Sequence, residues 1–366
     1  MIRKLKLFTL NLLAGINVGL VVIMLLVGYS DHLHPDSHPW LSCMGMAFPF
    51  VLAANAVFVP LWVFLSWRRL LIPILGFALA YTPINIYIPL HLPQQPPDDA
   101  LLVVSYNVAG YGGNYKYEQA FDTIFGYARR LSPDILCTQE DMSSKWLDTQ
   151  KRYAELFPYN DTVRVSDPSR NKAVNSVGIH TRFPILRKER ISYESISNGS
   201  VAYFLKVGAD TVVVVNNHLE STHLSNRDRR KYEDMLKGGM SRDTVQAETS
   251  LLVDKLGEAM AVRARQADAL HQWIDAHRQY PLIVCGDFND TPISYTRHAL
   301  AQGLTDCFVE AGNGLGLSFN RKGFNFRIDH LLCSGHFTPY RCEIDSKIDV
   351  SDHYPLLCWL KRNEKP

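Results

Sequence analysis

Three long stretches near the start of the chain contain no charged side chain. They run from Phe8 to Ser30, from Leu41 to Trp67 and from Leu70 to Leu92. A membrane's hydrocarbon core requires roughly 20 apolar residues in a helix, so we expect residues 1–92 to form a membrane region with about three transmembrane helices. Prolines interrupt the third stretch, so the sequence does not decide whether this stretch crosses the membrane. The basic N-terminus also permits an alternative for the first stretch, a cleaved secretory signal.

The basic residues flanking these stretches predict an orientation. Arg3, Lys4 and Lys6 precede the first stretch, and Arg68 and Arg69 separate the second from the third. The loop 31–40 has no lysine or arginine. Cytoplasmic loops carry an excess of such residues. We therefore expect the N-terminus on the cytoplasmic side of the inner (cytoplasmic) membrane. The rest of the chain, after the third stretch, is expected on the extracytoplasmic side.

The remainder of the chain alternates strand and helix patterns. Residues 93–99 are polar and rich in proline, which predicts an extended linker before a domain at 100–362. Apolar residues at helical spacing predict a helix over 121–131 and a long amphipathic helix over 244–277. Short apolar runs predict strands at 101–106, 134–138, 174–180, 201–207, 211–216, 281–285, 327–333 and 354–360. This mixed order favours a layered α/β or α+β domain.

Composition excludes several classes of protein. Hydrophobic residues make up 47% and charged residues 20%, which excludes a disordered chain. Residues 92–366 carry 33 basic and 34 acidic side chains, so no polycation attracts nucleic acid at long range. The seven cysteines include no C-x-x-C, which argues against zinc ribbons and thioredoxin-type sites. A disulfide between Cys333 and Cys342 stays open.

The loop Asp31–His38 reads Asp-His-Leu-His-Pro-Asp-Ser-His. Histidine and aspartate at these spacings can ligate zinc. The same composition is typical of a polar turn between two helices, and the sequence alone favours the turn.

Polar residues suited to chemistry cluster at the ends of the predicted strands. Asp287 and Asn289 are two residues apart, so on a strand they share a face. Oxygen-rich side chains gathered at strand ends suit Mg²⁺ or Mn²⁺, and such an ion polarises phosphoryl oxygens. No G-x-S-x-G or glycine-rich phosphate loop occurs. The motifs are Ser-Tyr-Asn-Val at 105–108, Thr-Gln-Glu at 138–140, Asn-His-Leu-Glu at 217–220, Gly-Asp-Phe-Asn at 286–289, Arg-Ile-Asp-His at 327–330 and Ser-Asp-His at 351–353.

In this order, the six motifs resemble those of the endonuclease/exonuclease/phosphatase superfamily, the deoxyribonuclease I-like phosphoesterases. The resemblance covers about residues 100–362 and is strongest to membrane-anchored bacterial members. It implies a four-layer α/β sandwich of two packed β-sheets flanked by helices, preceded here by the N-terminal transmembrane helices. It also implies divalent-metal-dependent hydrolysis of phosphate esters.

The resemblance further implies roles for individual residues. Glu140 is expected to be the main ligand of Mg²⁺ (or Mn²⁺), helped by Asn107, with Asp352 near the metal. Asp287 is expected to orient or deprotonate the attacking water, and Asn289 to hold the phosphate.

Two imidazoles complete the expected site. The resemblance places His353 against the phosphate, where it stabilises developing charge, with Asp329 behind it as the orienting carboxylate. His218 is expected to be a second imidazole at the phosphate, and Glu220 could orient it. A fixed hydrogen-bond partner selects one tautomer of a histidine, as this arrangement requires.

Two departures from the family bear on substrate. His330 stands where the family often has tyrosine. The long stretch His223–Lys231 supplies Arg227, Arg229 and Arg230, either as a clamp for an anionic headgroup or phosphate or as a solvated loop balanced by neighbouring acids.

These observations predict a membrane-anchored phosphodiesterase that hydrolyses its substrate by in-line attack of an activated water. Its substrate would be a lipid headgroup, a nucleotide or a nucleic acid, and membrane lipid would contact the N-terminal helices. The sequence indicates no obligatory protein partner. Two alternatives stay open: a nuclease acting on DNA or RNA, and a non-catalytic membrane-bound binding protein that retains the fold.

Overall fold

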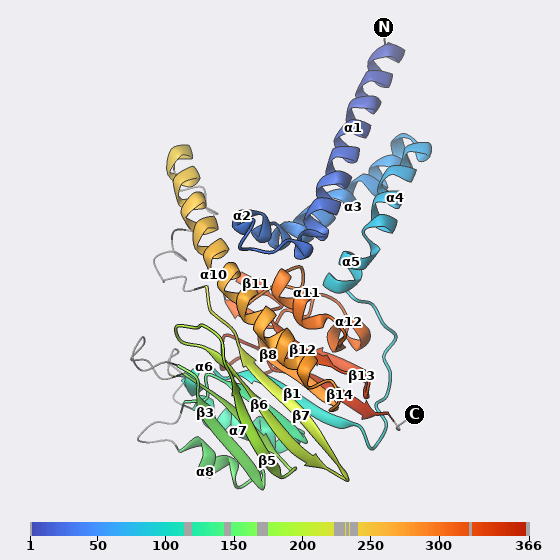
Figure 1. Cartoon of the computed structure of the whole chain (residues 1–366). Coiled ribbons are helices and arrows are strands. Elements are labelled where there is room, and N and C mark those ends of the chain that lie inside the picture. The colour runs from blue at the N-terminus through green and yellow to red at the C-terminus, as the bar shows by residue number, and fades with distance from the viewer. Residues whose placement is uncertain are drawn as a thin grey trace.

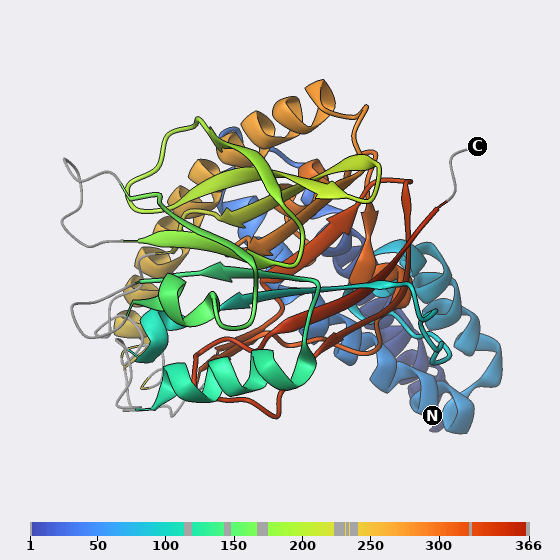
Figure 2. The ribbon, with the colours of Figure 1, turned by 90° about the horizontal axis from the view of Figure 1, so that it is seen from below.

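Two packed β-sheets covered by helices form the larger part of the molecule. The computed structural model describes residues 2–112, 119–142, 148–166, 175–222, 231, 234, 241–321 and 324–363. Figure 2 shows the two sheets as adjacent layers, with α7 (Ala120–Leu131) outside one and α10 (Arg242–Ala276) outside the other. The predicted four-layer fold is therefore confirmed, and we call residues 101–362 the sandwich.

The first sheet has six strands in the order β13-β14-β1-β2-β4-β3. Only β1 and β2 run parallel, and they place Asn107 level with Gln139. The other neighbours are antiparallel. The strands are β1 (Leu101–Asn107), β2 (Ile135–Gln139), β3 (Tyr159–Arg164), β4 (Ser176–Thr181), β13 (Phe337–Ile344) and β14 (Leu356–Arg362). Residue 174, at the start of the strand predicted over 174–180, lies outside the described residues.

The second sheet also has six strands, in the order β5-β6-β7-β8-β12-β9. Here β7 and β8 are the parallel pair, with His218 level with Asp287. The strands are β5 (Ile185–Ile191), β6 (Gly199–Val207), β7 (Asp210–His218), β8 (Leu282–Asp287), β9 (Thr305–Asp306) and β12 (Asp329–Cys333). A separate hairpin pairs β10 (Phe319–Arg321) with β11 (Phe324–Phe326).

Alternating side chains on the central strands build the core. In β8, Ile283 and Cys285 pack between the two sheets, whereas Leu282 and Val284 pack outward under the helices. Successive residues of a strand face opposite sides, so a strand that is covered on both faces reads as a continuous apolar run. This is why the eight predicted strands each correspond to an observed one.

Helices seal the outer faces of both sheets. Phe121, Ile124 and Phe125 of α7 pack on the first sheet. Leu270 and Ile274 of α10 pack on the second sheet. Among the described residues, the other helices of the sandwich are short: α6 (Ala109–Gly112), α8 (Thr149–Tyr153), α11 (Tyr295–Ala301) and α12 (Cys307–Ala311).

The N-terminal region, residues 2–87, consists of apolar helices that extend away from the sandwich (Figure 1). Two helical stretches, Ile2–His32 and Pro39–Leu65, are long and apolar enough to cross a membrane. The third predicted crossing is a pair of helices bent by 65° between Leu79 and Tyr81, so it is either a broken span or a re-entrant loop. The helices are α1 (Ile2–Gly28), η1 (Ser30–His32), α2 (Pro39–Ser42), η2 (Cys43–Ala47), α3 (Phe48–Leu65), η3 (Trp67–Leu70), α4 (Leu71–Leu79) and α5 (Tyr81–Tyr87).

Polar side chains join α1 to α3 within this apolar region. The indole nitrogen of Trp62 donates to Asn17 Oδ1 at 2.9 Å, and Asn17 Nδ2 lies 3.4 Å from Asn55 Oδ1. All three side chains are buried. Interhelical hydrogen bonds of this kind stabilise helix pairs where no water competes.

The N-terminal region packs directly on the sandwich. Gly257 of α10 lies against Pro39, and a Cβ at this glycine would meet the proline at 3.1 Å. The buried guanidinium of Arg327 donates to the backbone carbonyl of Ile86 at the end of α5. His91 Nε2 lies 2.7 Å from the carbonyl of Val309 in α12. The helices therefore hold a defined position relative to the sandwich.

Candidate active site

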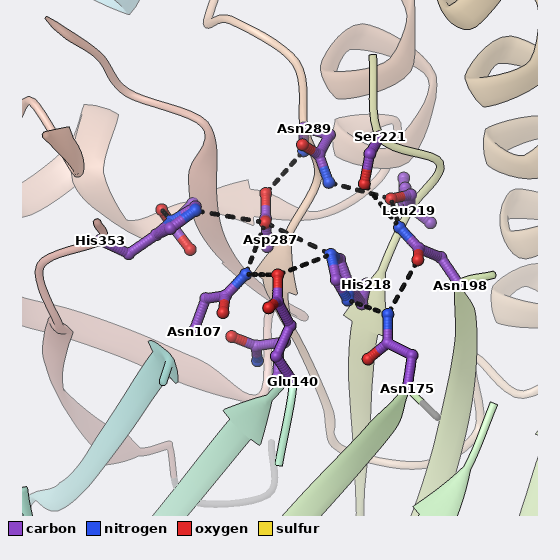
Figure 3. Close-up of polar contacts among 12 residues, drawn as sticks. Asn107, Glu140, Asn175, Asn198, His218, Leu219, Ser221, Asp287, Asn289 and His353 are labelled. Carbon is purple, nitrogen blue, oxygen red and sulfur yellow. Dashed lines mark hydrogen bonds and ion pairs between the residues drawn. The ribbon is translucent and has the colours of Figure 1, made fainter. Parts of the chain in front are cut away.

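The carboxyl ends of the two parallel strand pairs meet at one edge of the sandwich (Figure 3). Asn107 ends β1 and Glu140 follows β2 in the first sheet, while His218 ends β7 and Asp287 ends β8 in the second. Parallel neighbours bring such ends to the same edge of a sheet. Packing the two sheets face to face then brings four residues from distant parts of the chain into one site.

Asp287 lies at the centre of this site. Its Oδ2 atom accepts a hydrogen bond from Asn107 Nδ2 at 3.0 Å. The same oxygen lies 3.6 Å from Nε2 of His218 and 3.6 Å from Nε2 of His353. Asn107 Nδ2 also donates to Glu140 Oε1 at 3.2 Å, which ties the carboxylate of Glu140 to the same group.

His353 is held as a charged group by two carboxylates. Its Nδ1 atom lies 2.8 Å from Asp329 Oδ2, and Asp329 sits opposite Asp287 in the antiparallel pairing of β12 with β8. Burial opposes the charge on His353, but the attraction of Asp329 and Asp287 outweighs it and raises the pKa of His353 to about 10. His353 is therefore an imidazolium at neutral pH, with its Nε2–H directed toward Asp287.

The tautomer of His218 is fixed by a chain of amides. Asn198 Nδ2 donates to the carbonyl of Leu219 at 2.6 Å, so Asn198 Oδ1 is left to accept from Asn175 Nδ2 at 2.9 Å. This orients the amide of Asn175, whose Nδ2 also lies 3.2 Å from Nδ1 of His218. Because Nδ1 accepts, the proton of neutral His218 lies on Nε2, toward Asp287 (Figure 3). Burial lowers the pKa of His218, which keeps the ring neutral.

Two of the predicted site residues adopt the left-handed backbone conformation. Glu140 has φ 54° and Asn289 has φ 53°, a region that non-glycine residues rarely occupy. The Asn289 amide donates to Asp287 Oδ1 at 2.8 Å, and its side chain donates to the carbonyl of Leu219 at 3.0 Å. The residue before Asp287 is a glycine, Gly286, because a Cβ there would lie 2.0 Å from the carbonyl oxygen of Asn217.

The charges of the site suit a divalent cation. Asp287, Asp329 and His353 each place one ligand atom within 4.8 Å of the others. Burial, with the nearby charge of Asp329, raises the pKa of Asp287, and burial likewise raises the pKa of Glu140. Asp329 Oδ1 is buried without a hydrogen-bond partner. Crowded buried carboxylates are stabilised by pairing or by a metal, so the carboxylates of this site, Glu140 among them, fit an ion that prefers oxygen ligands.

Other predicted residues lie around this group or outside the described part of the chain. Asp352 forms an ion pair with Arg321, with Oδ2 of Asp352 3.0 Å from Nε of Arg321. Glu220, which could have oriented His218, accepts hydrogen bonds from Ser195 and the Ile196 amide, so its carboxylate secures the loop after β5. Arg227, Arg229 and Arg230 lie outside the described residues.

Sequence reasoning assigned no role to three further contributors to the site, two of which lie outside the motifs. Asn175 and Asn198 orient His218, and no spacing in the sequence marks either one. The hydroxyl of Ser351 donates to the carbonyl of Asn107 at 2.7 Å and accepts from the His353 amide at 3.2 Å. Ser351 opens the Ser-Asp-His motif, so its position next to His353 was the signal available for it.

The sequence matches the endonuclease/exonuclease/phosphatase family over residues 104–353. The chain belongs to this family. Residues 10–87 match a second family, described as a domain of unknown function. No curated protein is similar enough in sequence to match the chain.

Several solved structures share the fold of this chain. The human Nocturnin catalytic domain with bound sulfate is 17% identical over 74% of this chain and 97% of its own, with a TM-score of 0.51. Sphingomyelinase C from Streptomyces griseocarneus is 19% identical over 71% and 99%, also at 0.51. Humanized D. rerio TDP2 is 16% identical over 72% and 99%, with a TM-score of 0.51.

Proposed function

We propose that this chain is a membrane-anchored, divalent-metal-dependent phosphodiesterase that attacks phosphorus with an activated water. The observation that carries the proposal is the convergence on Asp287 Oδ2 of Asn107, His218 and His353, with Glu140 tied to the same amide. A phosphodiester gains charge around phosphorus during in-line displacement, and preorganised donors lower that barrier.

The protonation states of the site residues assign them different catalytic roles. Asp287 lies between the two imidazoles and is positioned to orient a water and accept its proton. With substrate bound, His353, charged through Asp329, would stabilise the negative oxygens of the phosphate, and neutral His218 would donate its Nε2–H to the phosphate. Asn289 is fixed through Asp287 and Leu219 to hold the phosphate in place.

A Mg²⁺ or Mn²⁺ ion would be held by Glu140 with Asn107, and Asp352 would lie near it. Glu140 suits this role because its side chain keeps 26% of its surface exposed, unlike that of Asp287. When bound, such an ion polarises a phosphoryl oxygen and offsets the charge of the leaving group.

The N-terminal region would place this site at a membrane surface. Its two long apolar helices support two crossings, and the bent pair after η3 supports a third. The basic residues Arg68 and Arg69 lie in η3, and Arg69 Nη2 lies 2.6 Å from Asn11 Oδ1 near the start of α1. This clustering supports the proposed orientation, with basic residues in the cytoplasm and the sandwich outside. Tethering favours substrates in or on the membrane, such as lipid headgroups.

The test uses the full chain in detergent micelles with bis-p-nitrophenyl phosphate and Mg²⁺ or Mn²⁺. We expect metal-dependent hydrolysis. Glu140→Gln, Asp287→Asn and His353→Gln should each lower kcat on the order of 10²–10⁴-fold. His336→Gln is the matched control, since His336 is exposed on the turn before β13. Absence of hydrolysis with either metal, or full activity in all three variants, would contradict an enzymatic role and favour the binding-protein alternative.

Substrate class is separated by a second measurement. The same preparation would be offered sphingomyelin and phosphoinositide vesicles, single-stranded DNA and RNA. The proposal predicts a preference for vesicle-borne diesters that changes little with salt. A preference for nucleic acid that falls steeply with added salt would instead favour the nuclease alternative, because phosphate contacts release counterions.

A further inference from the structure

A second cluster of metal-ligating side chains lies away from the candidate active site. Asp31, His32 and His298 place one ligand atom each within 4.8 Å of one another. Asp31 and His32 belong to η1, which follows α1, whereas His298 belongs to α11 of the sandwich. The cluster therefore joins the N-terminal region to the sandwich.

One buried carboxylate faces both imidazoles. The Asp31 side chain is only 3% exposed. Its Oδ1 lies 2.7 Å from His32 Nδ1, and its Oδ2 lies 3.6 Å from His298 Nδ1. The two rings are 4.3 Å apart between centroids. A buried carboxylate is costly unless it is paired or coordinates a metal, and two imidazolium rings this close would repel each other.

Neighbouring contacts hold the loop in place beside the cluster. His34 Nε2 lies 3.1 Å from Asp268 Oδ2, and the hydroxyl of Tyr295 donates to the other oxygen of Asp268 at 2.8 Å. Arg265 pairs with Asp36 farther along the loop. The loop after His32 and the start of α11 are thus held by contacts that do not involve the three ligand atoms of the cluster.

We propose that Asp31, His32 and His298 form a zinc site that fastens the N-terminal region to the sandwich. Zinc accepts nitrogen and carboxylate ligands, and its bonds of about 2.0–2.2 Å place tetrahedral ligand atoms roughly 3.3 Å apart. The distances from the two Asp31 oxygens to His32 Nδ1 (2.7 Å) and His298 Nδ1 (3.6 Å) lie on either side of that spacing. His32 is 57% exposed, which leaves room for water as a fourth ligand. Two imidazoles select zinc over magnesium, the ion suited to the oxygen-rich active site.

The experiment measures zinc retained by the full chain in detergent, after chelator treatment, in competition with a chromophoric chelator and excess Mg²⁺. We expect one zinc ion per chain, and tetrahedral visible absorption when Co²⁺ replaces it. His298→Gln and His32→Gln should each weaken zinc binding at least about 10-fold. His271→Gln is the matched control, because His271 faces only Asp275 on α10 among the ion pairs described for it. Glu140→Gln should leave this zinc in place.

Two results would overturn the proposal. The first is a chain that retains no zinc, which would leave a hydrogen-bonded His–Asp–His contact. The second is zinc lost in Glu140→Gln but kept in His298→Gln, which would place the ion in the active site. Should His298→Gln fail to fold, Asp31→Asn keeps the shape of the cluster and must weaken zinc binding in the same way. Normal zinc binding by Asp31→Asn would then reject the site.

Discussion

Asn175 donates from its amide to Nδ1 of His218 across 3.2 Å, and Asn198 fixes the direction of that amide. The backbone carbonyl of Leu219 sets the orientation of both amide side chains, because it accepts a hydrogen bond from Asn198 Nδ2 and another from Asn289 Nδ2. A single backbone oxygen thereby orients an imidazole and an amide that come from different strand ends.

Replacing Asn175 tests this orientation. Asn175→Asp puts a carboxylate next to Nδ1, which favours a proton on that nitrogen. With Asp287 at Nε2, the ring of His218 should then be protonated on both nitrogens, as that of His353 is, in place of the neutral Nε2–H tautomer. We expect kcat to fall about 10–100-fold, within the range attributed to one general acid or base. Nitrogen-15 NMR of the histidine rings should show His218 gaining a proton on Nδ1. Asn363→Asp is the control, since Asn363 is exposed near the C-terminus. An unchanged tautomer together with unchanged kcat would contradict the assignment.

The left-handed backbone at Glu140 predicts a difference between two inactive variants. Glu140→Ala keeps a Cβ at φ 54°, whereas Glu140→Gly removes it. Left-handed conformations cost about 1–2 kcal/mol for residues with a Cβ. We therefore expect the glycine variant to be more stable than the alanine variant by about 1 kcal/mol. Thermal unfolding of both variants in the same detergent measures this. An alanine variant of equal or greater stability would show that the backbone there is unstrained.

His330 predicts loss of stability in mild acid. Its ring is buried, with Nε2 3.0 Å from the carbonyl of Asp290. Burial lowers the pKa of His330 from 6.5 to about 4. The unfolded chain therefore binds more protons between these two pH values, so stability falls as pH drops from about 6.5 to about 4.

The size of this effect is isolated by His330→Gln. A shift of this size corresponds to up to about 3 kcal/mol by pH 4. Thermal melting of the chain and of His330→Gln at pH 7.5, 5.5 and 4.5 should show a steeper loss in the unmodified chain. Parallel pH dependence in the two proteins would mean that His330 is protonated normally in the fold.

A buried histidine–carboxylate contact involves Asp141, the residue after the metal-ligand candidate Glu140. His180 Nε2 lies 3.2 Å from Asp141 Oδ2, and both side chains are fully buried. Burial opposes the charge of Asp141, but His180 and the Thr138 hydroxyl outweigh it and lower its pKa. His180→Leu removes the imidazole partner of that buried carboxylate and leaves it the Thr138 hydroxyl, so it should destabilise the chain by about 3 kcal/mol. The double variant with Asp141→Asn should recover much of this loss, as a double-mutant cycle by thermal unfolding would show. Equal destabilisation by the single and double variants would exclude the pair.

The central strands could be predicted from sequence because they are covered on both faces. The strands that the apolar pattern missed include β3, β5 and β13, which lie at the edges of the sheets. In β5, Arg187, Lys188 and Glu189 occupy consecutive positions, and most of the strand is exposed. Charged edge strands protect sheets from unwanted pairing, and the same charges hide them from a search for apolar runs.

The candidate site could be predicted only as far as its motifs reach. Asp287, His353 and Glu140 lie in short segments whose order along the chain is informative. Asn175 and Asn198 act through hydrogen bonds to residues far away in sequence, so only tertiary structure reveals them. The same holds for Asp31 and His298, which come together because α11 packs on the loop after α1.

In the proposed membrane-anchored arrangement, the length of α1 sets how far the sandwich stands from the bilayer. At 27 residues, this helix is about 40 Å long, roughly 10 Å more than a hydrocarbon core. The first turns of α10 extend past α2 on the same side as α1 (Figure 1) and carry charged side chains such as Asp243 and Glu248. With α1 across a bilayer, the surplus turns give these charges room in the headgroup layer. Shortening α1 by two turns would force them toward the acyl chains, so the helix acts as a spacer as much as a tether.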